Sequence, residues 1–455
     1  MTKRNQGLFV TADGQHVGFT FVLVSSLFLL WGFCNGMIDV MDKHFQEELH
    51  LTLAQSANVQ WAHYLGYFLM AMPAGWLATK LGYKGGIIAG LLMVAVGGLW
   101  FIPATHIAQF WAFLVGVCFI AAGLTFLETI ANPYTTVLGP VQYAATRINL
   151  AQSCNGIGWV FGPIAGSLFF YAKDASGQST GSQTLWIPYA GVAVVVILLS
   201  AVFYFSNVPD IKMEDDYHLD DAAPGASHSI WKHPHFVMAV AAQFFYVAAQ
   251  SGIFAFFINY MTSQTPDVPG SWNGFLRAGW LEVGANGTLH VSNAFASILA
   301  SGGFICFLVG RITGAGLLKK FPAHTMLGLY AVLNMCVSLL IVARLGWVSV
   351  ACVFLSYFFM SIMFPTIFAL GIFGLGARAK KASSFIVMAI IGGALLPKLM
   401  GSIADAYDVS RGFIVPACCF AIVACYGFAW PRLSRADNMS GIMAPGGASS
   451  RRRVG

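Results

Sequence analysis

Charged side chains are scarce in this chain: Asp, Glu, Lys and Arg make up 9% of its 455 residues, whereas soluble domains carry about 25%. Hydrophobic residues make up 57%, and the mean hydropathy is +0.71. A soluble globular domain is therefore excluded, and a polytopic membrane protein is predicted. The formal net charge of +6 does not indicate nucleic-acid binding, because the basic residues are scattered over short loops and one tail.

Motifs of soluble enzymes are also missing from the sequence. We find no phosphate-binding loop, no HExxH pattern and no GxSxG pattern. The nine cysteines fall inside apolar runs, with neither metal-ligand spacing nor a pattern of loop disulfides. We therefore expect a protein that is not an enzyme and that holds no cofactor and no metal.

Apolar runs long enough to cross a bilayer recur along the chain, since a span needs about 20 such residues. They predict an all-α membrane protein with twelve transmembrane helices, at 19–41, 57–79, 86–104, 107–131, 147–171, 185–206, 236–262, 291–316, 324–344, 347–373, 382–404 and 412–431. The expected organisation is a cytoplasmic leader at 1–18, an N-terminal six-helix bundle at 19–206, an acidic cytoplasmic linker at 207–235, a C-terminal six-helix bundle at 236–431 and a disordered cytoplasmic tail at 432–455.

Lysine and arginine are distributed unevenly between alternate loops. With both termini placed inside, 18 of the 24 basic residues lie inside and 5 outside, and Lys398 falls within a span. The positive-inside rule therefore predicts a multi-pass protein of the inner (plasma) membrane with both termini in the cytoplasm. Arg311 is expected at the inner end of its span.

Two carboxylates fall clearly inside the expected spans, Asp39 and Glu128. An ionised acid at mid-bilayer costs about 2.5 to 3.5 kcal/mol on insertion scales, so it must be protonated, paired or exposed to a watery cavity. Glu128 shares a helical face with Asn132, four residues later. We predict that Glu128 carries a proton beside a polar solute pocket, with a purely structural pairing as the alternative. Asp39, which shares a face with Asn35, is either a second such group or an interfacial acid at a helix end.

Polar side chains also form stripes at helical spacing on two further spans. The fifth span carries Asn149, Gln152 and Asn155, and the seventh carries Gln243, Tyr246 and Gln250. Amides and carboxylates around a cavity suit a polyhydroxylated solute, because each offers donors or acceptors to hydroxyl groups. The alternative is hydrogen bonding between helices, worth about 0.6 to 2 kcal/mol.

Other side chains within the spans bear on the class of solute. Trp31, Trp61 and Trp159 could cover the apolar face of a sugar ring, although packing or interface roles are the alternative. Anionic solutes are disfavoured, because cations that could clamp them are nearly absent from the spans. His63 lies on an aromatic-rich face and is expected to be an ordinary hydrogen-bonded residue.

Short patterns recur between the two halves of the chain. Asn132-Pro133 corresponds to Phe364-Pro365 at an offset of 232, and Gly158 with Pro163 corresponds to Gly392 with Pro397 at an offset of 234. Such repetition predicts two halves with a site between them, an architecture typical of transporters in which one half rocks against the other.

From about Phe19 to Trp430 these features resemble the major facilitator superfamily and, within it, the fucose permease group of fucose, galactose and glucose proton symporters. The most specific segments are LETIANP at 127–133, NLAQSCN at 149–155, PTIFALG at 365–371 and SSFIVMAIIGG at 383–393. The resemblance implies twelve helices in two pseudo-symmetric six-helix bundles that work by alternating access. It also implies that Asp39 and Glu128 form the protonatable pair, and that Gln152 and Asn155 line the cavity.

The chain departs from the family pattern at two places. The loop signature has Thr79 where many members have Asp, which weakens any gating ion pair assigned to that loop. Beside Pro365 it has Phe364 where the fucose transporters have Tyr. The segment SIMFP at 361–365 is more similar to the glucose/galactose members. The sugar is therefore left open among fucose, galactose, glucose and N-acetylglucosamine.

We predict a proton-coupled symporter of the L-fucose type, importing a neutral monosaccharide. Protonated Glu128 would donate a hydrogen bond to the sugar, and loss of the proton to the cytoplasm would release it, with Asp39 as gate or relay. The expected partners are the sugar, the proton and the lipid bilayer, without nucleic acid, and the chain is expected to be a monomer. Sodium coupling, a drug/proton antiporter, a membrane enzyme and a non-transporting receptor are the alternatives.

Overall fold

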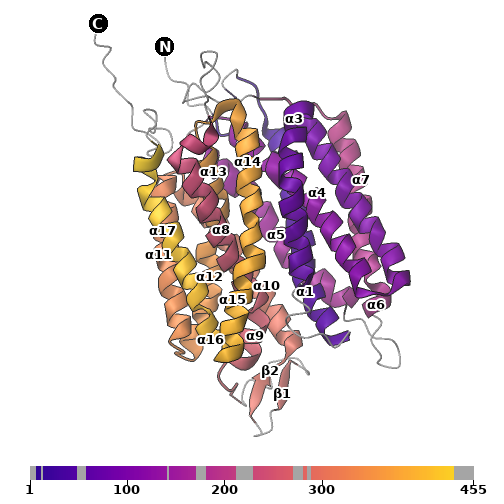
Figure 1. Ribbon diagram of the computed structural model, residues 1–455, viewed down its shortest axis with the longest axis vertical. Coiled ribbons are helices and arrows are strands. Elements are labelled where there is room, and N and C mark those ends of the chain that lie inside the picture. Colours follow the sequence, from indigo (N-terminus) through magenta and orange to yellow (C-terminus); the bar gives the residue numbers. More distant parts are fainter. Residues whose placement is uncertain are drawn as a thin grey trace.

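The computed structural model shows a helical membrane protein in which the helices before residue 206 lie beside those after residue 229 (Figure 1). It describes residues 7–11, 14–48, 58–140, 143–170, 181–211, 229–269, 280–283 and 288–434. Among these residues, ten helices or helix pairs are long and apolar enough to cross a bilayer. The tail from 435 and most of the acidic linker, at 212–228, lie outside the described residues.

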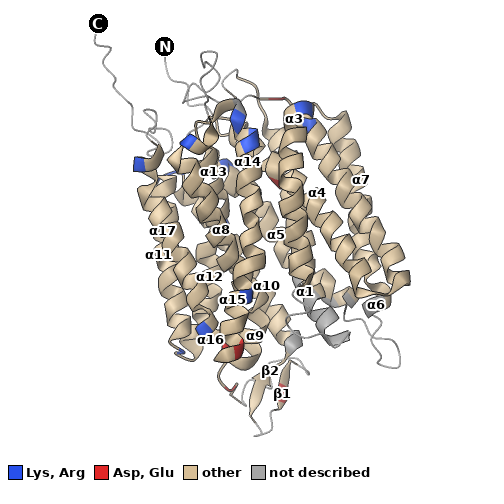
Figure 2. Cartoon of the chain, in the orientation of Figure 1, with Lys and Arg blue, Asp and Glu red and all other residues tan. Residues whose placement is uncertain are grey.

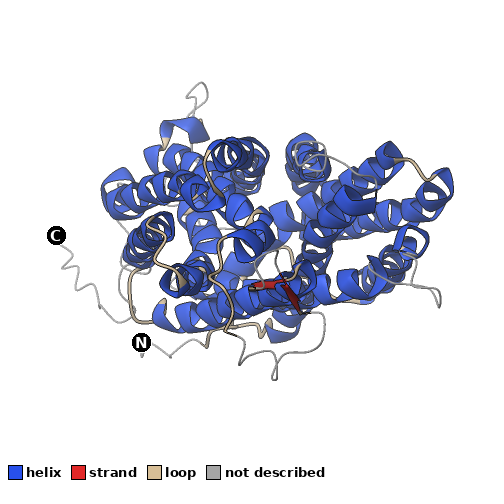
Figure 3. Cartoon of the chain, turned by 90° about the horizontal axis from the view of Figure 1, so that it is seen from below, coloured by secondary structure: helices blue, strands red, loops and turns tan. Residues whose placement is uncertain are grey.

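The first group of helices packs mainly within itself, as does the second, and Figure 3 shows the two groups from below. The first group comprises α1 (Gly18–Glu48), α3 (Asn58–Ile107), α4 (Phe110–Val137), α5 (Ala144–Phe170), α6 (Gly181–Thr184) and α7 (Trp186–Phe205). The second group comprises η2 (Ile230–Lys232), α8 (Pro234–Ala255), α9 (Phe257–Ser263), α10 (Asn293–Leu317), α11 (Ala323–Val342), α12 (Trp347–Met360), α13 (Met363–Ile372), η4 (Gly376–Arg378), α14 (Ala379–Met388), η5 (Ala389–Ile391), α15 (Gly392–Ala406), α16 (Val409–Gly412) and α17 (Ile414–Ser434).

Helix α3 contains two membrane crossings joined at Gly82. A straight helix of its 50 residues would be about 75 Å long, far more than a bilayer needs. Gly66 packs against Ala121 of α4 and Gly97 packs against Ile120, so both ends of α3 reach the same level of α4. The chain therefore folds back at Gly82, whose φ of 70° is accessible to glycine without a steric penalty.

Helix α5 completes the set of crossings in the described part of the chain. It is not among the ten helices above, but its 27 residues are long enough to cross a bilayer. The ten candidates, the second crossing of α3 and α5 together make twelve. The described helices therefore account for the twelve crossings that the sequence predicts.

The two ends of the molecule differ in charge (Figure 2). Blue segments gather at the end where α14 begins and α3 turns back, which we call the basic end. Lys80 and Lys84 lie beside the turn of α3 at Gly82, and Lys380 and Lys381 lie in the first turn of α14. The opposite end carries the antiparallel hairpin of β1 (Leu281–Val283) and β2 (Leu289–Val291), and we call it the strand end.

Arg147 is fully buried at the basic end and is held by main-chain carbonyls. Its guanidinium donates to Thr135 and Thr136 in the last turn of α4, and to Pro140 at 2.8 Å and Gly139 at 3.1 Å just beyond. The last carbonyls of a helix have no partner within the helix, so a buried guanidinium with five donors is well suited to satisfy them. This arginine is therefore explained by the helix end that it caps.

Two spans that were expected to be continuous are interrupted. The span at 347–373 breaks between α12 and α13, and the span at 382–404 passes through η5 between α14 and α15. Pro365 has no N–H and cannot donate to the carbonyl of Ser361, and Pro397 likewise cannot donate to Gly393. Side chains of other helices donate to both freed carbonyls: Arg311 of α10 donates to Ser361, and Ser251 of α8 donates to Gly393.

Candidate functional site

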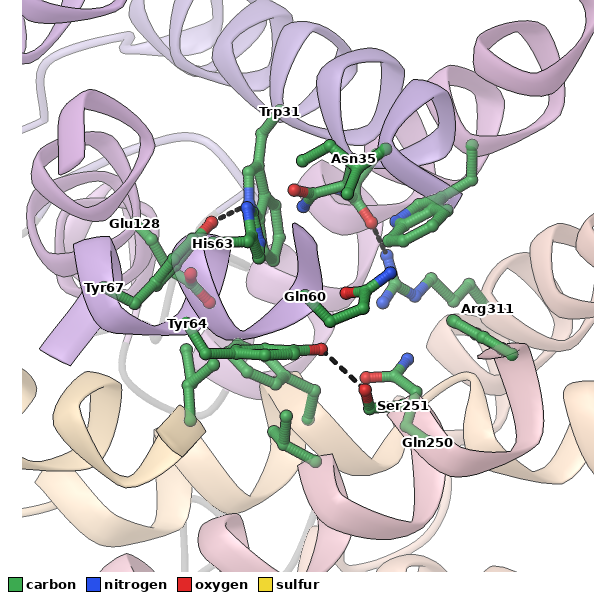
Figure 4. Close-up of a pocket in the computed structure, with 17 residues that line it drawn as sticks. Trp31, Asn35, Gln60, His63, Tyr64, Tyr67, Glu128, Gln250, Ser251 and Arg311 are labelled. Atoms are coloured by element: carbon green, nitrogen blue, oxygen red, sulfur yellow. Dashed lines mark hydrogen bonds between the residues drawn. The ribbon is translucent and has the colours of Figure 1, made fainter. Parts of the chain in front are cut away.

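A cavity lies between the two groups of helices (Figure 4). It extends from the middle of the molecule to Gln60, in the first turn of α3 at the strand end. Its lining comes from both groups: Trp31, Asn35, Ile38, Gln60, His63, Tyr64, Tyr67, Glu128, Asn155, Trp159, Val247, Gln250, Ser251, Phe254, Arg311, Phe364 and Ile390. A site shared by both groups can respond to their relative movement.

Glu128 lies in the wall of this cavity and does not face lipid. Its side chain is 2% exposed, and neither carboxylate oxygen has a hydrogen-bond partner among the described residues. The Tyr67 hydroxyl lies close enough to act on the carboxylate as a weak donor, although without good hydrogen-bond geometry, and the Arg311 cation attracts it. Glu128 is therefore not locked into an ion pair in the described structure.

Asn35 of α1 and Asn155 of α5 line the same cavity. They come to the same level because α1 and α5 pack closely: a Cβ added at Gly32 would lie 2.0 Å from the Asn155 carbonyl oxygen. The Oδ1 of Asn35 and the Nδ2 of Asn155 are buried and have no partner in the described part of the chain. Asp39 follows on α1, and its side chain lies outside the described residues.

Four predicted polar residues lie one layer behind the cavity wall in this structure. The Gln152 amide donates to Asn132 Oδ1 at 3.0 Å, and the Tyr246 hydroxyl donates to the Met360 carbonyl at 2.9 Å. Gln243 is fully buried with both amide atoms unpaired among the described residues. Helical spacing predicted the shared face correctly, but not how far that face turns toward the cavity, and direct contact of these residues with substrate stays a prediction.

Gln250 is the one member of the α8 stripe that reaches the cavity. It lies on the same face as Gln243 and Tyr246, nearer the strand end, where the two groups of helices leave room between them. Together with Asn35, Glu128 and Asn155, it makes four predicted site residues that the tertiary structure brings around one cavity.

Arg311 was expected at the inner end of its span, but it is buried in the cavity wall with 2% exposure. Its Nε donates to the Ser361 carbonyl at 2.8 Å, which is the carbonyl freed by Pro365. Its Nη1 lies 2.8 Å from Asn155 Oδ1, 3.1 Å from Gln152 Oε1 and 2.5 Å from the Gln152 carbonyl. One guanidinium thus joins α5 of the first group to the broken α12–α13 segment of the second.

The position of Arg311 also corrects the argument about anionic solutes. A cation does line the cavity, so anionic solutes cannot be excluded on the ground that cations are absent. Its Nε and Nη1 are already used by the protein, however, and a carboxylate ligand would need two free parallel donors for a bidentate contact. The arginine serves here as a connector between helices, beside Glu128.

A stripe on α3 was missed by the sequence analysis. Gln60, His63, Tyr64 and Tyr67 all line the cavity, and their spacing places them on one face of the helix. Trp61, which was a candidate for covering a sugar, is 54% exposed and points away from the cavity. The spacing of 60, 63, 64 and 67 is the signal in the sequence that predicts this stripe.

Tyr64 and Ser251 form a polar junction between the two groups of helices. The Tyr64 hydroxyl donates to Ser251 Oγ at 2.9 Å, and Ser251 Oγ donates to the Gly393 carbonyl at 3.2 Å. That carbonyl is the one that Pro397 cannot satisfy. A Cβ added at Gly393 would lie 2.5 Å from the Tyr64 ring, so glycine is required for this close approach.

Aromatic side chains cover much of the remaining wall. Trp159 of α5 stacks on Phe304 of α10 at 4.9 Å between ring centres, and Trp31 packs against Phe364 at 6.0 Å. The indole N–H of Trp31 donates to the Tyr67 hydroxyl. The cavity thus combines flat apolar surfaces with polar atoms, as ligand sites commonly do. No cluster of three His, Cys, Asp or Glu residues suited to a metal occurs in the described ranges.

At the basic end the two groups of helices are in contact. A Cβ added at Gly75 of α3 would lie 1.7 Å from Ser384 Oγ of α14. Lys380 Nζ lies 3.3 Å from Asp210 Oδ1 and 4.2 Å from the centre of the Tyr83 ring. The cavity is therefore closed toward the basic end, whereas it reaches Gln60 at the strand end.

The start of the linker takes part in this closure. The Tyr134 hydroxyl donates to the Pro209 carbonyl at 2.6 Å, and Lys84 Nζ donates to the Ser206 carbonyl at 2.9 Å. These bonds hold 206–210 against the first group, and Asp210 reaches Lys380 of the second. Asp210 thus supplies an acid at the closure.

Comparison with known proteins agrees with this architecture. The sequence profile of the Major Facilitator Superfamily matches residues 19–285. An L-fucose-proton symporter of Escherichia coli K12 is 35% identical over 89% of this chain and 91% of its own length. A glucose/galactose transporter of Brucella abortus is 30% identical over 92% of this chain and 95% of its own length.

Solved structures point the same way. The crystal structure of a variant of the Escherichia coli fucose:proton symporter superposes with a TM-score of 0.73 at 32% identity, covering 91% of this chain and 99% of that one. A second structure of that transporter, described as the outward conformation, gives a TM-score of 0.73 at 34% identity. The chain belongs to the Major Facilitator Superfamily and, within it, to the fucose permease group.

Proposed function

We propose that the protein is a proton-coupled symporter of the L-fucose type, which imports a neutral monosaccharide and is not an enzyme. One observation carries this proposal: the residues around one cavity carry buried polar atoms that have no hydrogen-bond partner among the described residues. These atoms are Asn35 Oδ1, His63 Nδ1, both Glu128 carboxylate oxygens and Asn155 Nδ2. A buried polar atom left unpaired costs about 1–3 kcal/mol. A sugar offers several hydroxyls that both donate and accept, so it can satisfy such a set at once.

Glu128 is the group that couples the proton to the sugar. Burial disfavours a charged carboxylate, and the protonated acid can donate to a sugar hydroxyl while its other oxygen accepts. Loss of the proton converts Glu128 to an acceptor-only anion, which removes that donated bond and weakens sugar binding. Coupling then requires that the proton and sugar together stabilise the occluded state. Asp39 would gate or relay the proton.

Charge supports a proposed orientation. The positive-inside rule places the basic end in the cytoplasm, and the proposed location is the inner membrane with both termini inside. The cavity, which reaches the strand end and is closed at the basic end, then corresponds to the outward-facing state. The proposed partners are the sugar, the proton and the bilayer, without nucleic acid, and the proposed state is a monomer.

The substrate is tested by uptake of labelled sugars into proteoliposomes that contain the purified protein, with a pH electrode in the suspension. We expect one or more of L-fucose, D-galactose, D-glucose and N-acetylglucosamine to enter, and external alkalinisation to accompany entry. A matched sample that substitutes sodium for potassium tests sodium coupling. Absence of uptake and binding for the whole panel would contradict the sugar proposal.

A drug/proton antiporter of the same fold is the second candidate. It would move protons opposite to its solute, so external acidification on entry of a lipophilic cation would support it. The unpaired hydrogen-bonding atoms of the cavity favour a hydroxylated solute over a lipophilic one, because the latter would leave these atoms unsatisfied.

The closure at the basic end yields a prediction about the ion pair of Asp210 and Lys380. Reversing one charge, as in Lys380→Asp, is expected to lower the initial uptake rate roughly two- to five-fold, since exposed pairs contribute up to about 1 kcal/mol. The swapped pair Asp210→Lys with Lys380→Asp should restore the rate. Lys320→Asp, an exposed change at the same end, is the control. If the swap transports no better than Lys380→Asp alone, the pair does not stabilise this closure.

A further inference from the structure

His63 is a polar residue of the cavity wall that takes no part in the proposed proton coupling. It lies on α3, one turn after the start of the helix, and its side chain is 5% exposed. Its Nδ1 is buried without a hydrogen-bond partner in the described part of the chain. The sequence-based expectation of an ordinary hydrogen-bonded histidine is therefore not met at Nδ1.

The ring of His63 is held in place by aromatic neighbours. It packs against Tyr67 at 4.9 Å and against Tyr64 at 5.2 Å between ring centres. Both tyrosines are themselves fixed, Tyr67 by the indole of Trp31 and Tyr64 by Ser251. A polar atom on a ring that cannot easily turn is preorganised for a ligand, because little side-chain entropy is lost on binding.

His63 lies among the atoms that the sugar must satisfy. Figure 4 shows it beside Trp31 and Tyr67, with Glu128 and Asn35 in the same cavity wall. A neutral imidazole carries one N–H donor and one acceptor nitrogen. It can therefore exchange a hydrogen bond with a sugar hydroxyl in either direction, at a place where its aromatic surroundings offer no other acceptor or donor to Nδ1.

We propose that His63 is a specificity-determining residue, which binds one hydroxyl of the transported monosaccharide through Nδ1. The proposal rests on the sugar-symporter function above and deepens it. A site that uses a buried polar atom for one hydroxyl rejects the analogue lacking that hydroxyl, since the atom is then left unpaired. His63 thus selects sugars by their hydroxyl pattern, whereas Glu128 couples transport to the proton.

The test uses the full-length protein and three substitutions. His63→Phe keeps an aromatic ring and removes the polar atoms, His63→Asn places an amide close to the Nδ1 position, and His63→Gln places one close to Nε2. Sugar binding is measured by quenching of tryptophan fluorescence, because Trp31 and Trp159 line the cavity. Each protein is titrated with the best sugar of the panel and with its single-deoxy derivatives.

We expect His63→Phe to weaken binding of the parent sugar roughly 3- to 10-fold, the range for one hydrogen bond. One deoxy derivative should bind wild type and His63→Phe equally well, while the others lose affinity to the same extent as the parent sugar. His63→Asn should restore parent affinity to within roughly 3-fold, and His63→Gln should not. His324→Asn, a histidine outside the cavity that stacks on Trp430, is the control.

The outcomes separate the inference from the function on which it rests. If wild type binds a sugar but His63→Phe loses affinity equally for all derivatives, or loses none, the inference alone is overturned. Rescue by His63→Gln and not by His63→Asn overturns the assignment to Nδ1. If wild type binds no sugar of the panel, the sugar function fails and the inference falls with it.

Discussion

Replacing Glu128 with glutamine is expected to abolish accumulation of sugar driven by a pH gradient, while sugar binding and exchange of sugar across the membrane persist. Glutamine keeps the shape of the protonated acid and its ability to donate one hydrogen bond and accept another. It cannot release a proton, so the carrier loses the step that links the two fluxes. With one proton per sugar, a gradient of one pH unit supports about tenfold accumulation, and in the variant the ratio should fall to about one.

The measurement compares uphill uptake with counterflow in the same vesicles. Counterflow needs only binding and alternating access, so it reports whether the variant is folded and mobile. Glu282→Gln, an exposed acid on β1, is the matched control and should accumulate sugar as wild type does. Full uphill uptake by Glu128→Gln would refute the proton role of this carboxylate. Loss of both uptake and counterflow would show instead that the acid is needed for folding or binding.

Replacing Arg311 is expected to have the second large effect. Arg311→Met removes the guanidinium that donates hydrogen bonds in the buried wall of the cavity. Its acceptors are the Ser361 carbonyl, Gln152 and Asn155 Oδ1. Each unpaired buried acceptor costs about 1–3 kcal/mol, so a loss of about 3 kcal/mol or more, roughly 100-fold, should appear in the rate of sugar uptake. The melting temperature in detergent should fall as well. Arg311→Lys should recover little, because one ammonium cannot reproduce the planar fork of donors.

A second-site change sharpens the test of Arg311. Pro365→Ala returns an N–H that can donate to the Ser361 carbonyl within the helix. In the Arg311→Met background this change should recover part of the melting temperature, although uptake stays low because Gln152 and Asn155 remain without the donor. Arg344→Met removes a half-exposed arginine from Asp408, which keeps Arg411 as a partner; it is the control and should alter little. Normal stability and uptake in Arg311→Met would contradict the role of Arg311 as a connector between helices.

The sequence was enough to predict the twelve-helix fold and the family, because long apolar runs have few structural solutions in a bilayer. It was also enough to single out Glu128, since an acid within an apolar run must be protonated, paired or exposed to a cavity. Two amides that line the cavity, Asn155 on α5 and Gln250 on α8, were among the residues predicted from the sequence. Helical periodicity gives the face of a helix, and a buried amide stripe must point toward protein rather than lipid.

The sequence could not say how deep each of these residues lies. Gln152 and Asn155 are one turn apart on α5, yet only Asn155 lines the cavity while Gln152 bonds to Asn132 behind it. The rotation of a helix about its axis is set by its neighbours, here by the contact of Gly32 on the backbone at Asn155. That contact joins residues more than one hundred positions apart, so no local pattern reveals it.

What the sequence determined by itself was the membrane class, the crossings and the position of Glu128 within an apolar run, because a bilayer leaves a chain of this composition few alternatives. What only the tertiary structure decided was the use of Arg311 and His63. A proline frees a carbonyl in its own helix, but the donor that satisfies it comes from another helix, as Arg311 does for Ser361. Likewise, Nδ1 of His63 is left for a ligand because its neighbours in space are aromatic rings.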